Sequence, residues 1–310
     1  MSVLIAAGLL AYALAVGVLA DRALTGGRWV SARPRLGLLV WHLTAAALVA
    51  AVTGAALLIS HDVLEQTLLL LLTADKSTLH LAYAGTASVP WLANLAVLLP
   101  MTLGAVIAAA FSTLAVQGRR VRRAMRRAVE TTAGSARVQD AHLVPGTSAS
   151  AFCIPGRRPL VVITSPTLDV LGSREIDAVL DHEREHLRRR HALQITWAEA
   201  VTSILGRGRL LRRYAAEVRR LAELAADDAA SARHGRRVVA TALLAMSTPG
   251  SSATAGGLAL AERHTAERIR RLLASSPSSR RRDALALVCA TTLTVVPLLG
   301  VLLPAAGVYW

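Results

Sequence analysis

Four long apolar runs without a charged residue constrain the fold of this chain more than any other feature of its sequence. They cover residues 3–20, 36–60, 91–116 and 284–310, so each has 18 residues or more. A helix of about 20 apolar residues crosses the hydrocarbon core of a bilayer. Aromatic side chains stand at the ends of these runs, as at a lipid–water interface; they are Trp29, Trp41, Trp91, Tyr309 and Trp310. We therefore predict a mainly α membrane protein with four transmembrane helices.

Composition agrees with this prediction, because 54% of the residues are hydrophobic and the mean hydropathy is +0.46, too apolar for an ordinary soluble protein. The first run has one alternative, a cleaved signal peptide, since Val18, Leu19 and Ala20 would suit a signal peptidase. A signal peptide begins with a basic segment, whereas Met1 and Ser2 carry no basic side chain. We favour the membrane helix.

Charged residues are distributed unevenly between the apolar runs. Segment 118–283 holds 30 arginines against 16 acidic residues, and segment 21–35 holds four arginines against one aspartate. Segment 61–90 holds three acidic residues and one lysine. Positively charged loops stay on the cytoplasmic side of a membrane. We expect a multi-pass protein of the cell membrane, with both basic segments in the cytoplasm and segment 61–90 and both termini outside.

The net charge of +15 raises nucleic-acid binding as an alternative. Nine of the arginines, however, directly flank the third and fourth apolar runs, where anionic lipid headgroups attract arginine. They are Arg119, Arg120, Arg122, Arg123, Arg126, Arg127, Arg280, Arg281 and Arg282. Neither helix-turn-helix spacing nor interleaved aromatic residues point to DNA. We expect the lipid bilayer as their partner, and no direct contact with nucleic acid.

The chain divides into three parts at these changes of charge. Residues 1–117 contain three membrane helices, residues 118–283 form a cytoplasmic α+β domain, and residues 284–310 contain the fourth helix and a short outer tail. Two alternating apolar segments, Ala151–Ile154 and Leu160–Thr164, flank a turn with Pro and Gly, which predicts a β-hairpin.

Helices follow the hairpin. The first is expected from about residue 174 through His191 or beyond, with Ser173 as its N-cap. Three more are expected over about residues 210–232, 233–246 and 258–274, from their apolar periodicity.

The first of these helices contains the motif His-Glu-x-x-His, from His182 to His186, within the stretch VLDHEREHLRRRH. At about 100° per residue, Glu183 lies in the centre of the apolar stripe and both histidines lie at its edge. Glu185 lies on the opposite face, which we expect to be solvated, and we place His191 on the solvated side as well.

A glutamate that faces the apolar side between two histidines is costly unless another group compensates its charge. A zinc ion would do so: His182 and His186 bind it, and Glu183 takes a proton from the attacking water. The two cysteines, Cys153 and Cys289, form no Cys-x-x-Cys motif, so a further zinc ligand must be a histidine or a carboxylate. The alternative is a charged helix face without a metal.

A catalytic zinc ion has three protein ligands and leaves one position for water. On a continuous helix His191 points too far from the histidine pair to be the third. The candidates are Glu199, Glu217, Glu223, Asp227 and His234. Glu223 and Asp227 are four residues apart on one helix face, which suits a ligand and a carboxylate that orients a histidine. A plain acidic helix face is the alternative.

With AVLDHEREHLRRRH followed by VRRLAELAADDAA, the sequence resembles the BlaR/MecR type of membrane zinc metallopeptidase and, more distantly, the HtpX/Ste24 type. These are gluzincins, with one zinc ion per chain. The resemblance implies that His182, His186 and Glu223 bind zinc, that Glu183 is the catalytic base, and that Asp227 supports a ligand.

The hairpin FCIPGRRPLVVITS is also similar to that of the family, in which an edge strand pairs with an extended substrate. We expect this strand to comprise Leu160, Val161, Val162, Ile163 and Thr164. His234 and Tyr214 are the candidates for a donor to the oxyanion.

In the BlaR/MecR family the substrate is typically a cytoplasmic repressor, here expected to be of the winged-helix type. Its beta-lactam sensors carry a penicillin-binding domain after the fourth helix. This sequence ends at Trp310, so we expect no such sensor. We predict an integral-membrane zinc endopeptidase for regulatory proteolysis. Two alternatives stay open: an HtpX-like quality-control protease and a non-catalytic membrane scaffold or sensor.

Overall fold

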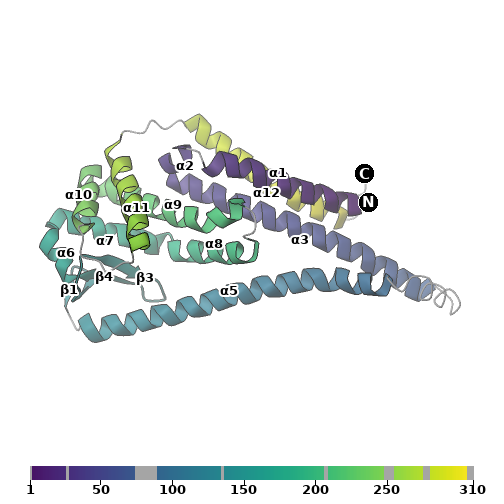
Figure 1. The fold of residues 1–310 in the computed structure, drawn as a ribbon, viewed down its shortest axis with the longest axis horizontal. Helices are drawn as coiled ribbons and strands as arrows, with labels where there is room; N and C mark the ends of the chain where they lie inside the picture. Colours follow the sequence, from purple (N-terminus) through teal and green to yellow (C-terminus); the bar gives the residue numbers. More distant parts are fainter. Residues whose placement is uncertain are drawn as a thin grey trace.

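The computed structural model describes residues 2–25, 28–73, 89–133, 136–205, 209–247, 255–274 and 280–305. Helices dominate this part of the chain, together with one small sheet (Figure 1). Three long helices lie side by side at one end: α1 (Ser2–Thr25), α3 (Pro34–Thr73) and α12 (Arg280–Ala305). The short helix α2 (Arg28–Ala32) lies between α1 and α3 in the chain, and α5 (Val89–Ala133) runs along one side of the molecule.

Two helices are long and apolar enough to cross a membrane. The qualifying segments are Leu4–Leu24 in α1 and Pro34–Ile59 in α3, which agree with the first two predicted spans. Among the described residues no third helix meets the same criterion, and α12 offers a shorter apolar stretch, Leu287–Pro297. A signal sequence or a buried core helix also meets it, so the two helices suggest membrane association only weakly. The other two crossings and the orientation stay predictions; Tyr309 and Trp310 lie outside the described residues.

One hydrophobic core joins the long helices to the rest of the protein. Val30 and Trp41 are buried in it beside Val218 and Leu221 of α9 (Arg209–His234). Trp41 also stacks on Tyr214 of α9, with ring centroids 6.0 Å apart. Burial of such large side chains contributes about 2–3 kcal/mol each. Helix α9 is thus anchored directly on α3.

The sheet confirms the predicted hairpin and adds two strands. Its order is β1 (Arg137–Val138), β2 (Ala141–Val144), β4 (Leu160–Thr164) and β3 (Ala151–Ile154). β3 and β4 pair antiparallel, and β4 also pairs with β2 in parallel. The expectation that Leu160, Val161, Val162, Ile163 and Thr164 form the substrate edge is therefore wrong, because β4 has a strand on both sides. Among the described strands, β3 forms the free edge on this side.

The pairing register shows which backbone groups of β3 point to that free edge. The Thr164 N–H donates to the Ser150 carbonyl, so Phe152 and Ile154 also face β4 with their N–H and C=O groups. Hydrogen-bonded and non-hydrogen-bonded pairs alternate along an antiparallel ladder. The N–H and C=O groups of Ala151 and Cys153 therefore point away from β4.

In the described part of the chain, six helices complete the domain. They are α6 (Ser165–Val170), α7 (Ser173–Arg188), α8 (His191–Leu205), α9, α10 (Arg236–Met246) and α11 (Ala255–Leu273). The predicted continuous helix through His191 is wrong, since α7 ends at Arg188 and Arg190 has a left-handed backbone, with φ 54°. Few residues other than glycine adopt this conformation. The predicted N-cap Ser173 is also wrong, because Gly172 occupies that position.

Glu185 is buried, although we expected it to be solvated. Its side chain is 2% exposed, and its carboxylate pairs with Arg35, Arg188 and Arg189, each about half exposed. Arg35 stands near the start of α3 and donates to Glu185 at 3.1 Å, so this carboxylate also ties α7 to α3. Burial raises the pKa of Glu185, but hydrogen bonds from Arg188 and Arg189 outweigh it and lower the pKa below its usual value.

We predict that Glu185→Gln lowers the free energy of unfolding at pH 7 by about 1–2 kcal/mol, since it removes charge-assisted hydrogen bonds to largely solvated arginines. Because the folded-state pKa is lowered, the stabilisation is present above the unfolded-state pKa of about 4.3 and is lost as the pH falls through the folded-state value. Thermal unfolding in detergent at pH 7 and about pH 3 measures both effects. Glu130→Gln, at an exposed ion pair, is the control. A difference that does not shrink in acid would contradict the prediction.

Candidate metal centre

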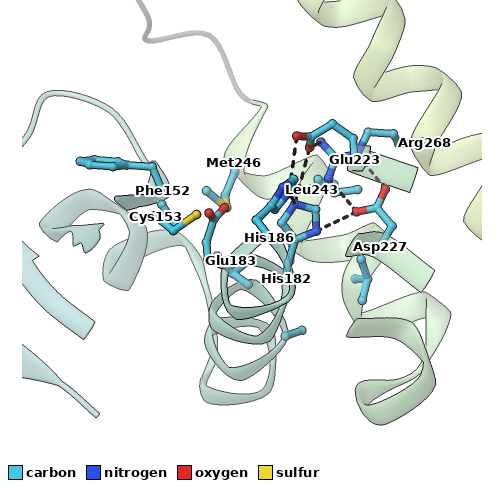
Figure 2. A pocket seen from close by; sticks show the side chains of 15 residues that line it. Phe152, Cys153, His182, Glu183, His186, Glu223, Asp227, Leu243, Met246 and Arg268 are labelled. Atoms are coloured by element: carbon cyan, nitrogen blue, oxygen red, sulfur yellow. Dashed lines mark hydrogen bonds and ion pairs between the residues drawn. The ribbon is translucent and has the colours of Figure 1, made fainter. Parts of the chain in front are cut away.

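Helix α7 presents the two motif histidines side by side. His182 and His186 are one helical turn apart, and their side chains are 11% and 13% exposed. Their Nε2 atoms lie 3.1 Å apart (Figure 2). Two ligand nitrogens on one tetrahedral zinc ion, each at about 2.0–2.1 Å, stand about 3.3 Å apart. The spacing of the two imidazoles therefore fits shared coordination of zinc.

Helix α9 brings Glu223 to the same point. Its Oε2 lies 3.5 Å from His182 Nε2, and its Oε1 lies 3.5 Å from His186 Nε2. One ligand atom from each of the three residues lies within 4.8 Å of the other two. Two imidazoles and one carboxylate are a known ligand set of catalytic zinc. These residues would hold the metal and leave a fourth coordination position.

A second carboxylate on α9 lies behind the histidine pair. Asp227 is fully buried, and its Oδ1 lies 3.1 Å from His182 Nδ1, the nitrogen that faces away from Glu223. Arg268 of α11 donates to both Asp227 oxygens, at 2.7 and 2.6 Å, and pairs with Glu223 Oε2 at 3.0 Å. Burial raises the pKa of Asp227, but the hydrogen bonds from Arg268 and His182 outweigh it and lower the pKa.

The two histidines differ in proton affinity. Burial disfavours the charged form of His182, but hydrogen bonds to Asp227 and Glu223 outweigh it and raise its pKa to about 9. Burial and then the positive charge of His182 lower the pKa of His186 to about 4. For Glu223, the hydrogen bond to His182 and the charge of Arg268 outweigh burial and lower the pKa.

Glu183 faces a pocket of about 410 Å³ next to this cluster. Burial raises the pKa of Glu183, the charge of His182 partly offsets it, and the charge of Glu223 raises it further. The side chain of Cys153 on β3 lies close to the Glu183 carboxylate (Figure 2), and its thiol partly offsets the rise in the pKa of Glu183. The apolar part of the pocket comes from α7, β3 and α10; it is lined by Ala151, Phe152, Ala178, Val179, Val239, Ala242, Leu243 and Met246.

The profile of Peptidase family M48 matches residues 115–286, more than half of the chain and all of the residues of this cluster. The chain belongs to peptidase family M48. Peptidases of this family depend on zinc, which agrees with the donor set of His182, His186 and Glu223. No curated protein and no solved structure matches the chain.

Several residues that we predicted as oxyanion donors or zinc ligands of this M48 peptidase lie outside the pocket and the ligand cluster. Tyr214 is fully buried with its hydroxyl 2.5 Å from His42 Nδ1, and His234 Nε2 lies 2.9 Å from Asp181. Neither lines the pocket, so neither is placed as the predicted oxyanion donor. Glu199 and Glu217 pair with Arg219 and Arg220 and do not belong to the metal-ligand group.

Two residues of the M48 site were missed at the sequence level. Arg268 could not be singled out, because arginine supplies 34 of the 35 basic residues and one arginine carries little information. His191 was placed on the solvated side, but it is 1% exposed and its Nδ1 lies 3.0 Å from His186 Nδ1. The break in the helix at Arg190 brings His191 next to His186. No glycine or proline in this part of the sequence predicts that break.

We predict that Arg268→Met lowers the free energy of unfolding by about 3 kcal/mol, since it leaves the buried Asp227 carboxylate without its bidentate partner. Thermal unfolding of the purified protein in detergent measures the effect. Arg270→Met is the matched control, because Arg270 is exposed on the same helix and donates to the Ala266 carbonyl within its own turn. Equal midpoints for the two variants would contradict the prediction.

Proposed function

We propose that this M48 peptidase is an integral-membrane zinc endopeptidase that hydrolyses a cytoplasmic protein, namely a transcriptional repressor of the winged-helix type. The observation that carries the enzymatic part is the convergence of His182, His186 and Glu223 beside a pocket that Glu183 faces. The repressor is supported by the resemblance of the sequence to the BlaR/MecR type. The cytoplasmic side is supported by the excess of arginine in segment 118–283.

His182, His186 and Glu223 would hold one Zn²⁺, and Asp227 orients the His182 imidazole through its Nδ1. When bound, zinc acts as a Lewis acid on a carbonyl oxygen and lowers the pKa of water. Arg268 pairs with both acidic side chains, the partly exposed ligand Glu223 and the buried, supporting Asp227, and so favours their charged forms.

Glu183 is the general base of the proposed reaction. Burial raises the pKa of its carboxyl, which brings its proton affinity closer to the working pH. It accepts a proton from the attacking water and passes it to the amine that leaves when the peptide bond breaks. Burial and the nearby charge of Glu183 raise the pKa of Cys153, so its thiol stays protonated beside this carboxylate.

The substrate backbone would lie along the free edge of β3. An extended peptide can pair there with the outward N–H and C=O groups of Ala151 and Cys153, in the manner of β-strand addition. Both residues line the pocket that contains Glu183. A peptide bond held on this edge is therefore brought beside the base and the ligand cluster.

The regulatory role is supported by the packing of α9 on the long helices. Glu223 and Asp227 stand on the same helix as Tyr214 and Val218, which are buried against α3. A displacement of α3 by an outside signal would therefore act on the helix that carries a zinc ligand. This contact between α9 and α3 suits an enzyme whose activity is regulated by a signal at the membrane.

We predict that Glu183→Gln lowers peptide-bond hydrolysis about 10²- to 10⁴-fold, because the amide cannot take a proton from water. Zinc content stays at one per chain, since the three ligands are unchanged. Zinc is measured on protein purified in detergent, and cytoplasmic proteins are compared for changes in size between cells that express wild type or variant.

Glu175→Gln, on the first turn of α7, is the control for the Glu183 variant. Wild-type protein without stoichiometric zinc would overturn the enzymatic assignment. Zinc-loaded wild type that leaves the size of every repressor in the cell unchanged would overturn the regulatory one.

We predict that Ala151→Pro raises KM for a peptide substrate about 3- to 10-fold, the worth of one main-chain hydrogen bond. Proline removes an N–H that points to the free edge of β3, and the pairing with β4 does not use it. Ala151→Ser keeps the N–H and is the control. Kinetics on peptides cut by the wild type make the measurement, and equal KM values for the two variants would exclude this edge as the substrate site.

A further inference from the structure

His191 is a buried histidine that the proposed reaction does not use. It is the first residue of α8, and its side chain is turned back over the end of α7 by the left-handed backbone of Arg190. Its ring meets that of His186 edge to face, with centroids 4.8 Å apart and an interplanar angle of 84°. A conformation of this kind at a non-glycine residue costs about 1 kcal/mol or more and persists where the surrounding structure enforces it.

The contact between the two rings is between their Nδ1 atoms, 3.0 Å apart. His186 directs its other nitrogen, Nε2, toward His182 and Glu223. A neutral imidazole that binds a metal through Nε2 carries its proton on Nδ1 and needs an acceptor there. His191 Nδ1 stands in the position of that acceptor, which requires the proton of His191 to lie on its Nε2.

We propose that His191 is a positioning residue, which accepts the Nδ1–H of His186 and thereby fixes the tautomer and ring orientation of this zinc ligand. The inference rests on the proposed zinc site and assigns an acceptor to its second histidine. Asp227 serves His182 in the same way, through the 3.1 Å contact at Nδ1. The two ligands then differ, since one has a carboxylate behind it and the other a neutral imidazole.

A buried histidine also fills space, so the test must separate hydrogen bonding from shape. His191→Asn places an amide oxygen near the position of Nδ1 and keeps the acceptor. His191→Leu keeps the volume and removes the acceptor. The full-length protein in detergent is titrated with Zn²⁺ against a chelator, and the absorption spectrum of the Co²⁺-loaded protein reports the ligand geometry.

We expect His191→Leu to weaken zinc affinity about 10- to 100-fold and to shift the Co²⁺ spectrum, as for other partners of metal-bound histidines. His191→Asn should stay within about threefold of the wild type, because it restores the acceptor. Equal affinity in His191→Leu and wild type would overturn the proposal. So would equal losses in the Asn and Leu variants, which would assign His191 a role in shape alone.

Two further outcomes are distinguishable. If His191→Leu does not fold, His191→Gln replaces it, because its amide lies near Nε2 and not near Nδ1; affinity as high as that of His191→Asn would then contradict the proposal. If the wild type itself binds no zinc, the proposed function fails as well. If the wild type binds zinc and the variants do not differ from it, only the role of His191 fails.

Discussion

The buried Asp227 carboxylate is the interaction on which the site depends, because it joins three helices through charged hydrogen bonds. It accepts two bonds from Arg268 of α11 and contacts His182 of α7, while Asp227 itself stands on α9. An uncompensated charge in such a place would cost several kcal/mol. The helices must therefore assemble together, and the two turns that carry His182 and Glu223 are held at the distance that a metal ion requires.

Helix α9, which carries Asp227, also packs against the long apolar helices. The part of α9 before Glu223 is buried against α3 through Tyr214, Val218 and Leu221. A second tie runs from Arg35 of α3 to Glu185 of α7. Helices α7 and α9, which carry the ligand cluster, thus both contact α3 directly.

Short-range spacing explains which features could be predicted from the sequence. His182 and His186 are four residues apart, as are Glu223 and Asp227, so periodicity alone places each pair on one helix face. Strand order depends on β2, which pairs with β4 from outside the hairpin, and no local pattern shows it. The turn at Arg190 brings His191 into contact with His186. Arg35, Arg188 and Arg189 pair with Glu185 and allow it to be buried. A helical wheel describes one unbroken, isolated helix, so it predicts neither arrangement.

The surroundings of Glu183 and Glu223 shift the pKa values of these two glutamates in opposite directions. Glu223 lies against Arg268 and the histidines, which lower its pKa and keep it charged, as a metal ligand must be. Burial and the nearby charge of Glu223 raise the pKa of Glu183, as suits a group that takes up and releases a proton. Arg268 pairs with Glu223 and Asp227 and favours the charged form of both carboxylates. The fold thus keeps these two carboxylates charged and leaves Glu183 as the carboxylate that can exchange a proton.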